Sequence, residues 1–429
     1  MQQVLFHIPI LQNQFGPEGI PIHGFGAMLF LTFVICMNFA VRRGRLGGVS
    51  ADRIQDLSLV LLVSGIVGAR IFYMIQYKVP FSQFFKIWEG GIVFYGSVLG
   101  GTIGYIVLYY YVLRRLKIST WVLADAIAPA LAMGLVLGRV GCLLNGCCYG
   151  QVASSECASL EFPLLTGPVR STVAQKYSYQ TTLGFSSIDR SEENDPRTIV
   201  DKVEADSQAL RAGLQPGDKI LKFNGQDNGL LILFLTTPSG LDSVRKIEKD
   251  LGKLTEIDPV SENSQGLYTF LVTSPNLYLL AKDEFSKIPG VRQLSATDLL
   301  SYQLRNWPKG KAKVQFTVER NKEVIELPEY TPRSLGLQPT QLYESISMIL
   351  MVFLLVSFYP FRRHDGQVMV LLMFGYAIHR FLNEMLRNDT DPIFDFVSLT
   401  ASMTVSILVF AGAILLELYL RKTQPRRTV

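Results

Sequence analysis

Long apolar segments set the fold of this chain before any motif is considered. Hydrophobic residues make up 48% of the sequence, and charged residues only 18%. This hydrophobic share exceeds what a soluble core needs. Seven windows are long and apolar enough to cross about 30 Å of hydrocarbon as helices. The sequence therefore predicts an α-helical polytopic membrane protein with seven transmembrane helices, at Gly24–Val41, Leu57–Tyr77, Gly91–Leu113, Trp121–Leu144, Leu342–Phe361, Val368–Leu386 and Ile393–Leu420.

Basic residues predict the orientation of these helices. They cluster after the first, third, fifth and seventh windows, so all clusters fall on one side of the membrane, which is the cytoplasmic side by the positive-inside rule. The N-terminus then lies outside and the C-terminus in the cytoplasm. This distribution accounts for the net charge of +5 without a nucleic-acid partner. Residues 1–22 lack the basic start and cleavage pattern of a signal peptide.

The segment 151–337 differs in kind from the rest of the chain. It is rich in Asp, Glu, Lys, Ser and Pro and contains no window that could span a membrane. It separates residues 1–150, with four predicted helices, from residues 338–429, with three. We expect it to form a soluble domain outside the membrane.

Part of this segment has the pattern of a small mixed α/β domain. Val200–Gly225 reads as a strand, a short helix, a tight turn and a second strand. Ala209 and Leu210 begin the helix, Gly213 ends it, and Ile220–Phe223 alternates like a half-buried strand.

This pattern resembles the middle of a PDZ domain, which we place at about 178–330. Leu183, Gly184 and Phe185 resemble the carboxylate-binding loop of that family, whose backbone N–H groups can hold an anionic peptide terminus. Lys313–Arg320 is the expected closing strand. A purely structural insert that binds no peptide is the alternative.

The expected PDZ-like domain is longer than its pattern requires. The segment 227–295 contains a strand-like stretch at Leu230–Thr237, a helix-like stretch at Leu241–Leu254 and a second strand-like stretch at Tyr268–Ser274. The sequence therefore predicts an elaborated extracytoplasmic domain.

Two arginines, Arg139 and Arg380, lie deep in apolar windows, where a cation is costly unless an anion meets it. A rise of about 1.5 Å per residue places both in the outer half of the bilayer, together with Arg70, Tyr95 and Glu344. We expect one polar cavity there that opens outward or sideways. Because guanidinium groups bind phosphate through paired hydrogen bonds, the arginines predict a phosphate ligand.

The sixth window adds a local pattern. Tyr376, Arg380 and Glu384 recur every four residues and so share one helix face, and Arg387 follows Glu384 by three. Glu384 is therefore expected to pair with both arginines. For each arginine alone, the alternative is a side chain that snorkels to the lipid headgroups.

Several sequence blocks now carry a resemblance across the membrane part. GRVGCLLNGCCYG, preceded by DAIAP, resembles the signature of bacterial prolipoprotein diacylglyceryl transferases, and WEGGIVFYGSVLGG, QPTQLYE and GYAIHRFLNEMLR resemble further blocks in the same order. The resemblance implies an enzyme of the bacterial cytoplasmic membrane that moves the diacylglyceryl group of phosphatidylglycerol to the lipobox cysteine of a prolipoprotein signal peptide, releasing glycerol phosphate. It implies no cofactor and no metal.

The resemblance also implies roles for single residues. Arg139 and Arg380 would bind the lipid and act in catalysis, with Tyr95 as a further catalytic candidate. The residues implied to support them are Asp125, Asn145, Gly150, Tyr376, Glu384 and Arg387. Further candidates for substrate binding are Arg70, Gln341 and Glu344, and Phe25, which falls where the family often has a tyrosine.

One departure from the family concerns Tyr95, because many members carry His there and that His has been assigned to proton abstraction from the thiol. A neutral phenol, with a reference pKa near 10, is a poor base for a thiol with a pKa of about 8.5. We therefore hypothesise that the positive cavity stabilises the substrate thiolate directly. An inactive lipid- or lipoprotein-binding relative is the alternative function.

The sequence allows more than one role for the cysteines and histidines. A disulfide between Cys157 and either Cys147 or Cys148 is plausible outside the reducing cytosol. His379 precedes Arg380 and is expected to point away from its face. A membrane protease is disfavoured because the HExxH motif is absent.

Overall fold

The computed structural model describes the chain in two compact units. The membrane unit comprises residues 5–144, 148–151 and 338–429, and the insert unit comprises residues 1–4, 145–147 and 152–337. The residues described are 3–10, 19–85, 93–154, 156–165, 168–188, 194–236, 238–251, 254–258, 266–272, 274–305, 307–308, 310–387, 392–394 and 399–426.

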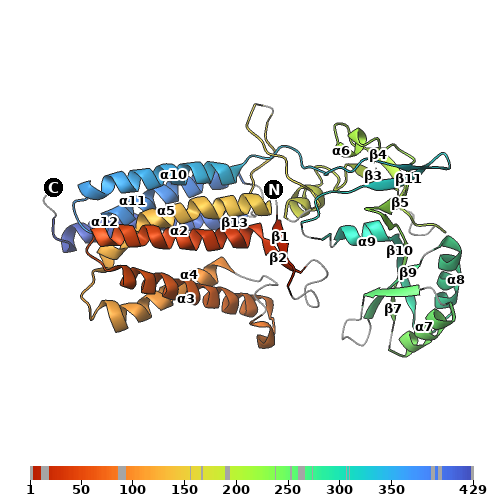
Figure 1. The fold of residues 1–429 in the computed structure, drawn as a ribbon, viewed down its shortest axis with the longest axis horizontal. Helices are drawn as coiled ribbons and strands as arrows, with labels where there is room; N and C mark the ends of the chain where they lie inside the picture. The colour runs from red at the N-terminus through yellow and green to blue at the C-terminus, as the bar shows by residue number, and fades with distance from the viewer. Residues whose placement is uncertain are drawn as a thin grey trace. The chain divides into compact units, whose positions relative to one another are not determined.

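Long helices build the membrane unit (Figure 1). They are α2 (Gly24–Leu46), α3 (Ala51–Tyr77), α4 (Phe94–Leu108), α5 (Thr120–Asn145), α10 (Thr340–Phe358), α11 (Gln367–Met385) and α12 (Ala401–Thr423). Short elements join or flank them: β1 (Val4–Ile8), β2 (Ile20–His23), η1 (Phe81–Gln83), the π-helix η3 (Tyr109–Leu113), η5 (Tyr359–Phe361), β13 (Pro392–Phe394) and β14 (Leu399–Thr400).

Among the described residues, six helices are long and apolar enough to cross a membrane, so the chain is a multi-pass membrane protein. The helix outside this set is α11, whose length of 19 residues would suffice. It carries His379, Arg380, Asn383 and Glu384, which lower its hydropathy. The last helix begins at Ala401, later than the predicted Ile393, because Thr400 caps its N-terminus by accepting a hydrogen bond from the Met403 N–H at 3.3 Å.

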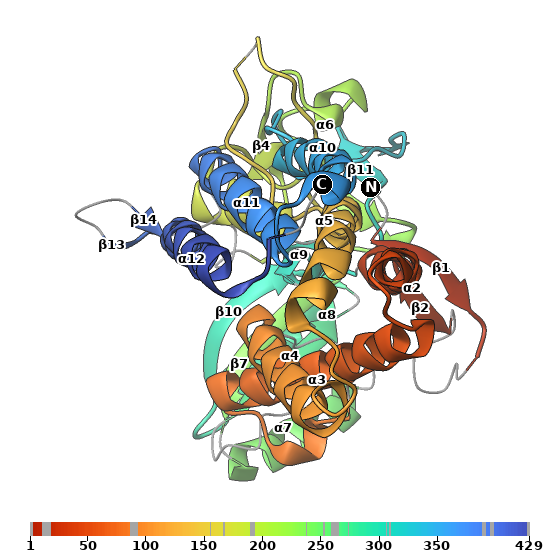
Figure 2. The same ribbon diagram turned by 90° about the vertical axis from the view of Figure 1, so that its left-hand side faces the viewer.

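α3 and α4 lie side by side in the membrane unit (Figure 2), and small residues let their backbones touch. A Cβ added to Gly68 would lie 2.4 Å from the carbonyl oxygen of Gly96, so only glycine fits. Ala128 and Ala132 of α5 form one buried cluster with α10 and α11.

The insert unit contains a PDZ-like part. β3 (Phe185–Ser187) pairs with β4 (Val200–Val203), and a four-stranded antiparallel sheet has the order β12 (Glu323–Glu326), β11 (Phe316–Arg320), β5 (Lys219–Phe223), β6 (Gln226–Asp227). The predicted short helix is α6 (Gln208–Arg211), which Ser207 caps, and Gly213 after it has a φ of +87°. The expected pattern of strand, helix, turn and strand is confirmed.

The long segment inside this part folds as a second α/β layer. Its elements are β7 (Leu230–Thr236), α7 (Pro238–Leu251), β8 (Leu254–Asp258), β9 (Gly266–Val272), α8 (Pro275–Ser286) and β10 (Arg292–Asp298). The sheet is antiparallel with the order β10-β7-β9-β8. This βαββαβ succession with central first and third strands is the ferredoxin-like topology.

Both faces of the central strand β7 are buried. Ile232 and Phe234 pack with the helices α7 and α8, whereas Leu231 and Leu233 belong to the core of the PDZ-like part. A buried polar network strengthens this connection, since the Asp298 carboxylate accepts hydrogen bonds from Asn228 Nδ2 at 2.7 Å and from the Thr198 backbone N–H at 2.7 Å. The two parts of the insert unit therefore share one continuous core.

The ferredoxin-like layer leads directly into α9 (Leu299–Arg305). Asp298 caps this helix by accepting a hydrogen bond from the Ser301 N–H at 3.0 Å. Arg170, in the π-helix η4 (Arg170–Lys176), donates to the carbonyl oxygen of Leu304 at 2.5 Å at the other end. The position of α9 is thus fixed at both ends.

Candidate active site

The centre of the candidate site is the buried carboxylate of Glu344 on α10. Arg139 on α5 lies with its Nε 2.9 Å from Glu344 Oε1, and Asn383 on α11 donates to Oε2 at 3.1 Å. Arg380 Nη1 lies 3.9 Å from the same Oε2. Glu344 is 0% exposed, so this carboxylate holds side chains of three helices together inside the bundle.

A second carboxylate, Glu384, organises the α11 side of the site. Arg380 Nη2 lies 2.8 Å from Glu384 Oε2, and Arg387 Nη1 lies 3.8 Å from it, as the helical spacing predicts. The neighbouring helix contributes hydroxyl groups: Thr400 donates to Glu384 Oε1 at 3.0 Å, and Ser402 accepts from Arg380 Nη2 at 2.8 Å. The guanidinium of Arg380 is therefore oriented by two helices.

The cluster brings guanidinium groups and carboxylates together in a largely buried place. The guanidinium groups of Arg139, Arg380 and Arg387 lie against the two carboxylates of Glu344 and Glu384. Guanidinium groups bind phosphate through paired hydrogen bonds, so the cluster is suited to bind a phosphate anion.

An apolar cavity of about 700 Å³ adjoins this cluster. Tyr376 belongs to both, because it lines the cavity and interacts electrostatically with Glu344, Arg380 and Arg139. The remaining lining side chains are apolar or small for the most part. Examples from the contributing helices are Phe33 of α2, Leu61 of α3, Leu131 of α5, Met373 of α11 and Val409 of α12.

Gly150 supports the site through its backbone. It forms a β-bridge with Arg387, and a Cβ at this position would lie 2.8 Å from the carbonyl oxygen of Leu386. The close approach that only glycine allows therefore fixes the backbone beneath Arg387. Gln341, one helical turn before Glu344 on α10, is buried. Phe25 on α2 packs at Gly141 of α5.

Other predicted site residues have their described contacts elsewhere. Arg70, which is 3% exposed, donates to the backbone carbonyl oxygens of Gln83 and Phe84 at 2.6 and 3.2 Å. Asn145 ends α5, and its side-chain nitrogen lies 3.6 Å from the Cys147 thiol sulfur. Tyr95 lies in α4, and its side chain is outside the part of the structure that is described.

Asp125 caps a helix. Its carboxylate accepts hydrogen bonds from the backbone N–H groups of Gly366, Val368 and Met369, at 2.9, 2.9 and 3.2 Å, and so holds the N-terminus of α11. Fourteen residues along α5 separate Asp125 from Arg139 in the sequence, which is about 21 Å at 1.5 Å per residue. These contacts indicate a structural role for Asp125.

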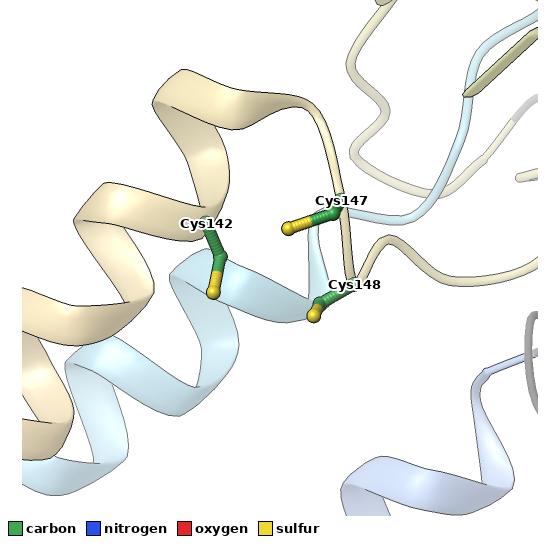
Figure 3. Close-up of side chains that lie close together, drawn as sticks. All are labelled: Cys142, Cys147 and Cys148. Atoms are coloured by element: carbon green, nitrogen blue, oxygen red, sulfur yellow. The ribbon is translucent and has the colours of Figure 1, made fainter. Parts of the chain in front are cut away.

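The cysteines differ from the expectation. No disulfide joins any of the five, all of which are described, and the exposed Cys157 thiol instead accepts a hydrogen bond from Ser154. The thiols of Cys142, Cys147 and Cys148 lie within 4.8 Å of one another (Figure 3). Within the described residues, they form the one group of His, Cys, Asp or Glu side chains close enough to share a metal ion.

The predicted peptide-binding loop lies in the PDZ-like part of the insert unit. Leu183, Gly184 and Phe185 are buried, and Gly184 has a φ of +84°. The carbonyl oxygen of Leu183 accepts a hydrogen bond from Tyr330 Oη at 3.0 Å. Leu183 and Gly184 also line a cavity of about 260 Å³ next to α6.

Several residues of the site were not predicted from the sequence. Asn383 could have been found, because it follows Tyr376 by seven residues and so lies on the same face of α11. No sequence pattern indicated Thr400 or Ser402, because their contacts with Glu384 and Arg380 depend on how α12 packs. His379, expected to point away, interacts electrostatically with Glu344, Arg380 and Arg139.

Comparisons with known proteins identify the family of this chain. Residues 13–194 and 298–419, well over half of the chain, match the family model described as prolipoprotein diacylglyceryl transferase. Residues 172–228 match the model of the PDZ domain. That match ends just before β7, where the ferredoxin-like layer interrupts the PDZ-like part.

Curated relatives carry the name phosphatidylglycerol–prolipoprotein diacylglyceryl transferase. One from Rhodopirellula baltica is 30% identical over 227 residues, which is 49% of this chain and 44% of the relative. One from Wigglesworthia glossinidia brevipalpis is 30% identical over 36% of this chain and 59% of the relative. One from Limosilactobacillus reuteri is 35% identical over 31% of this chain and 48% of the relative. The chain thus spans about half the length of the curated relatives it matches.

By the family model, which covers both parts of the membrane unit, this chain belongs to the prolipoprotein diacylglyceryl transferase family.

Proposed function

We propose that this protein transfers the diacylglyceryl group of phosphatidylglycerol to the lipobox cysteine of a prolipoprotein, releasing glycerol phosphate. This reaction is the first step of bacterial lipoprotein maturation. Family membership and the names of the curated relatives support the proposal.

The observation that carries the proposal is a pair of carboxylate-oriented arginines, Arg139 and Arg380, beside an apolar cavity. The single phosphate of phosphatidylglycerol bears one negative charge, which suits the guanidinium groups that Glu344 and Glu384 orient. The apolar cavity of about 700 Å³ next to Tyr376 offers room for acyl chains. In this arrangement the headgroup binds Arg139 and Arg380 while the chains lie among apolar side chains.

The same cations serve the chemistry. As the cysteine sulfur attacks the glyceryl carbon, the carbon–oxygen bond breaks and negative charge builds up on the departing phosphate. Guanidinium groups already oriented by Glu344 and Glu384 stabilise that charge without reorganising. The phosphate supplies the leaving group and the substrate supplies the nucleophile, so we propose a reaction without cofactor or metal.

We further propose the orientation and location of the chain. All seven long helices, α11 included, cross the bacterial cytoplasmic membrane, with the N-terminus and the insert unit outside and the C-terminus in the cytoplasm. The basic residues after α2, η3, η5 and α12 support this orientation.

Transfer by the purified protein tests the function. Protein in detergent or nanodiscs is incubated with phosphatidylglycerol labelled in its acyl chains and a lipobox peptide, with a Cys→Ser peptide as control. We expect label on the cysteine peptide alone and release of glycerol phosphate. A folded protein that binds the lipid but transfers no label would support the inactive relative instead.

The PDZ-like part is proposed to bind a peptide or protein, with Leu183, Gly184 and Phe185 as the loop that receives an anionic terminus. Replacing residues 175–328 with a short Gly/Ser linker tests its contribution. We expect transfer to a short lipobox peptide to continue and transfer to a full-length precursor to fall, because the membrane unit holds the arginines. Loss of transfer to both substrates, with the membrane unit still folded, would assign the insert a direct part in catalysis.

A further inference from the structure

The proposed transfer requires a step that the arginines do not perform, and the inference here rests on that function. The substrate cysteine arrives largely as a thiol, because the reference pKa of a thiol is about 8.5. The thiolate is the nucleophile, so the proton must pass to an acceptor near the reacting carbon. Guanidinium groups stabilise the thiolate but do not accept its proton.

The carboxylates of the site are poorly suited to this task. Glu344 and Glu384 are engaged by Arg139, Arg380, Arg387 and Asn383. A carboxylate has a reference pKa of about 4, which makes it a much weaker base than an imidazole with about 6.5. A proton on either carboxylate would also weaken the ion pairs that orient the arginines.

Among the described residues, His379 is the imidazole near the cluster around Glu344. On α11 it follows Tyr376 by three residues and precedes Asn383 by four, so it borders the face that carries Arg380. Its Nε2 is buried and has no hydrogen-bond partner among the described residues. It interacts electrostatically with Glu344 on α10 and Arg139 on α5 as well as with Arg380. A buried ring nitrogen without a partner leaves its hydrogen-bonding capacity to an incoming group.

We propose that His379 is the general base that takes the proton of the substrate thiol. The neutral imidazole accepts the proton through Nε2, and the sulfur attacks the glyceryl carbon. A carbon–sulfur bond forms while the carbon–oxygen bond to the phosphate breaks, and its electron pair leaves with glycerol phosphate. The imidazolium then releases its proton to the departing phosphate or to water, which restores the starting state.

The surrounding charges suit this cycle. In this proposal the imidazole is neutral before the reaction, beside the cations of Arg139 and Arg380. The Glu344 carboxylate stabilises the imidazolium once it forms. The phenol of Tyr376, also on this face, is no competing base, because the reference pKa of a phenol is near 10.

The pH dependence of His379→Gln tests the proposal. General base catalysis typically contributes about 10²–10⁴-fold, so a loss of that size is expected near pH 7. The loss should shrink as the pH rises through about 8.5, because the peptide then arrives as thiolate. The KM for phosphatidylglycerol should stay near that of the unaltered protein. A matched control is His364→Gln, whose imidazole lies 3.3 Å from Glu417 and which should keep full activity.

A second variant, His379→Ala, tests the proposal if His379→Gln does not fold. In His379→Ala, added imidazole should restore part of the transfer, whereas it should have no effect on Arg139→Ala. An active His379→Gln with the unaltered pH profile would overturn the proposal, and so would a loss that is the same at every pH. Absence of transfer by the unaltered protein would instead refute the proposed function itself.

Discussion

Replacing Arg139 with alanine is expected to slow diacylglyceryl transfer by about 10²–10³-fold, the usual cost of removing one preorganised donor from developing negative charge. Arg139 is the guanidinium that α5 brings to the buried Glu344 carboxylate. Without it, the lipid phosphate loses one of the two guanidinium groups proposed to bind it. Initial rates with labelled phosphatidylglycerol, at saturating lipid, measure the effect.

A loss of activity could also arise from instability, because the variant leaves Glu344 with weaker compensation. The double variant Arg139→Met with Glu344→Gln removes both charges and separates the two causes. We expect it to regain thermal stability in detergent but not transfer. Arg139→Lys should keep part of the activity, since it retains the charge but loses the paired hydrogen bonds. Recovery of transfer in the double variant would rule out the proposed role of Arg139.

Replacing Asp125 with alanine is expected to destabilise the membrane unit by about 3–5 kcal/mol, the range for breaking a buried charge pair. Its carboxylate caps α11 and lies 3.3 Å from Arg362 Nε. Removing it leaves the first N–H groups of α11 and a buried guanidinium without that acceptor. A large fall in the midpoint of thermal unfolding in detergent, with and without phosphatidylglycerol, is the expected result.

The same variant also tests the alternative role of Asp125 in substrate binding. Protein that remains folded at low temperature should show a KM for phosphatidylglycerol close to that of the unaltered protein. Asp125→Asn should be less damaging, because one amide oxygen can still accept hydrogen bonds from the helix N-terminus. A strongly raised KM with little change in the unfolding midpoint would show that Asp125 acts on the substrate.

Local patterns predicted much of this molecule. The apolar windows located the long helices because span length is a property of sequence alone. The pairing of Glu384 with Arg380 and Arg387 followed from helical spacing, which fixes neighbours within one helix. Among the described residues, six helices meet the length and composition criteria for a membrane span, one fewer than the seven predicted. The missing helix is α11, which carries the polar residues of the site.

Contacts between distant segments were out of reach. Nothing in the spacing of residues showed that Glu344 meets Arg139, or that Asp125 meets the N-terminus of α11, because both contacts depend on helix packing. The strands and helix of the inserted layer were predicted in part, but their order β10-β7-β9-β8 was not, since strand order follows from long-range pairing. The same limit applies to the disulfide that the structure lacks.

The backbone pairing around Gly150 has a consequence for how such a chain can change over evolution. The Gly150 N–H donates to the Gln338 carbonyl oxygen at 2.8 Å, and the Gln338 N–H donates to the Gln151 carbonyl oxygen at 2.9 Å. Hydrogen bonds within the membrane unit thus hold together the two chain segments that flank the insert. Loop-closure entropy grows only slowly with length, so the helices tolerate almost any module that starts and ends at these paired segments. Nested domains could therefore be acquired, enlarged or exchanged here without redesign of the bundle.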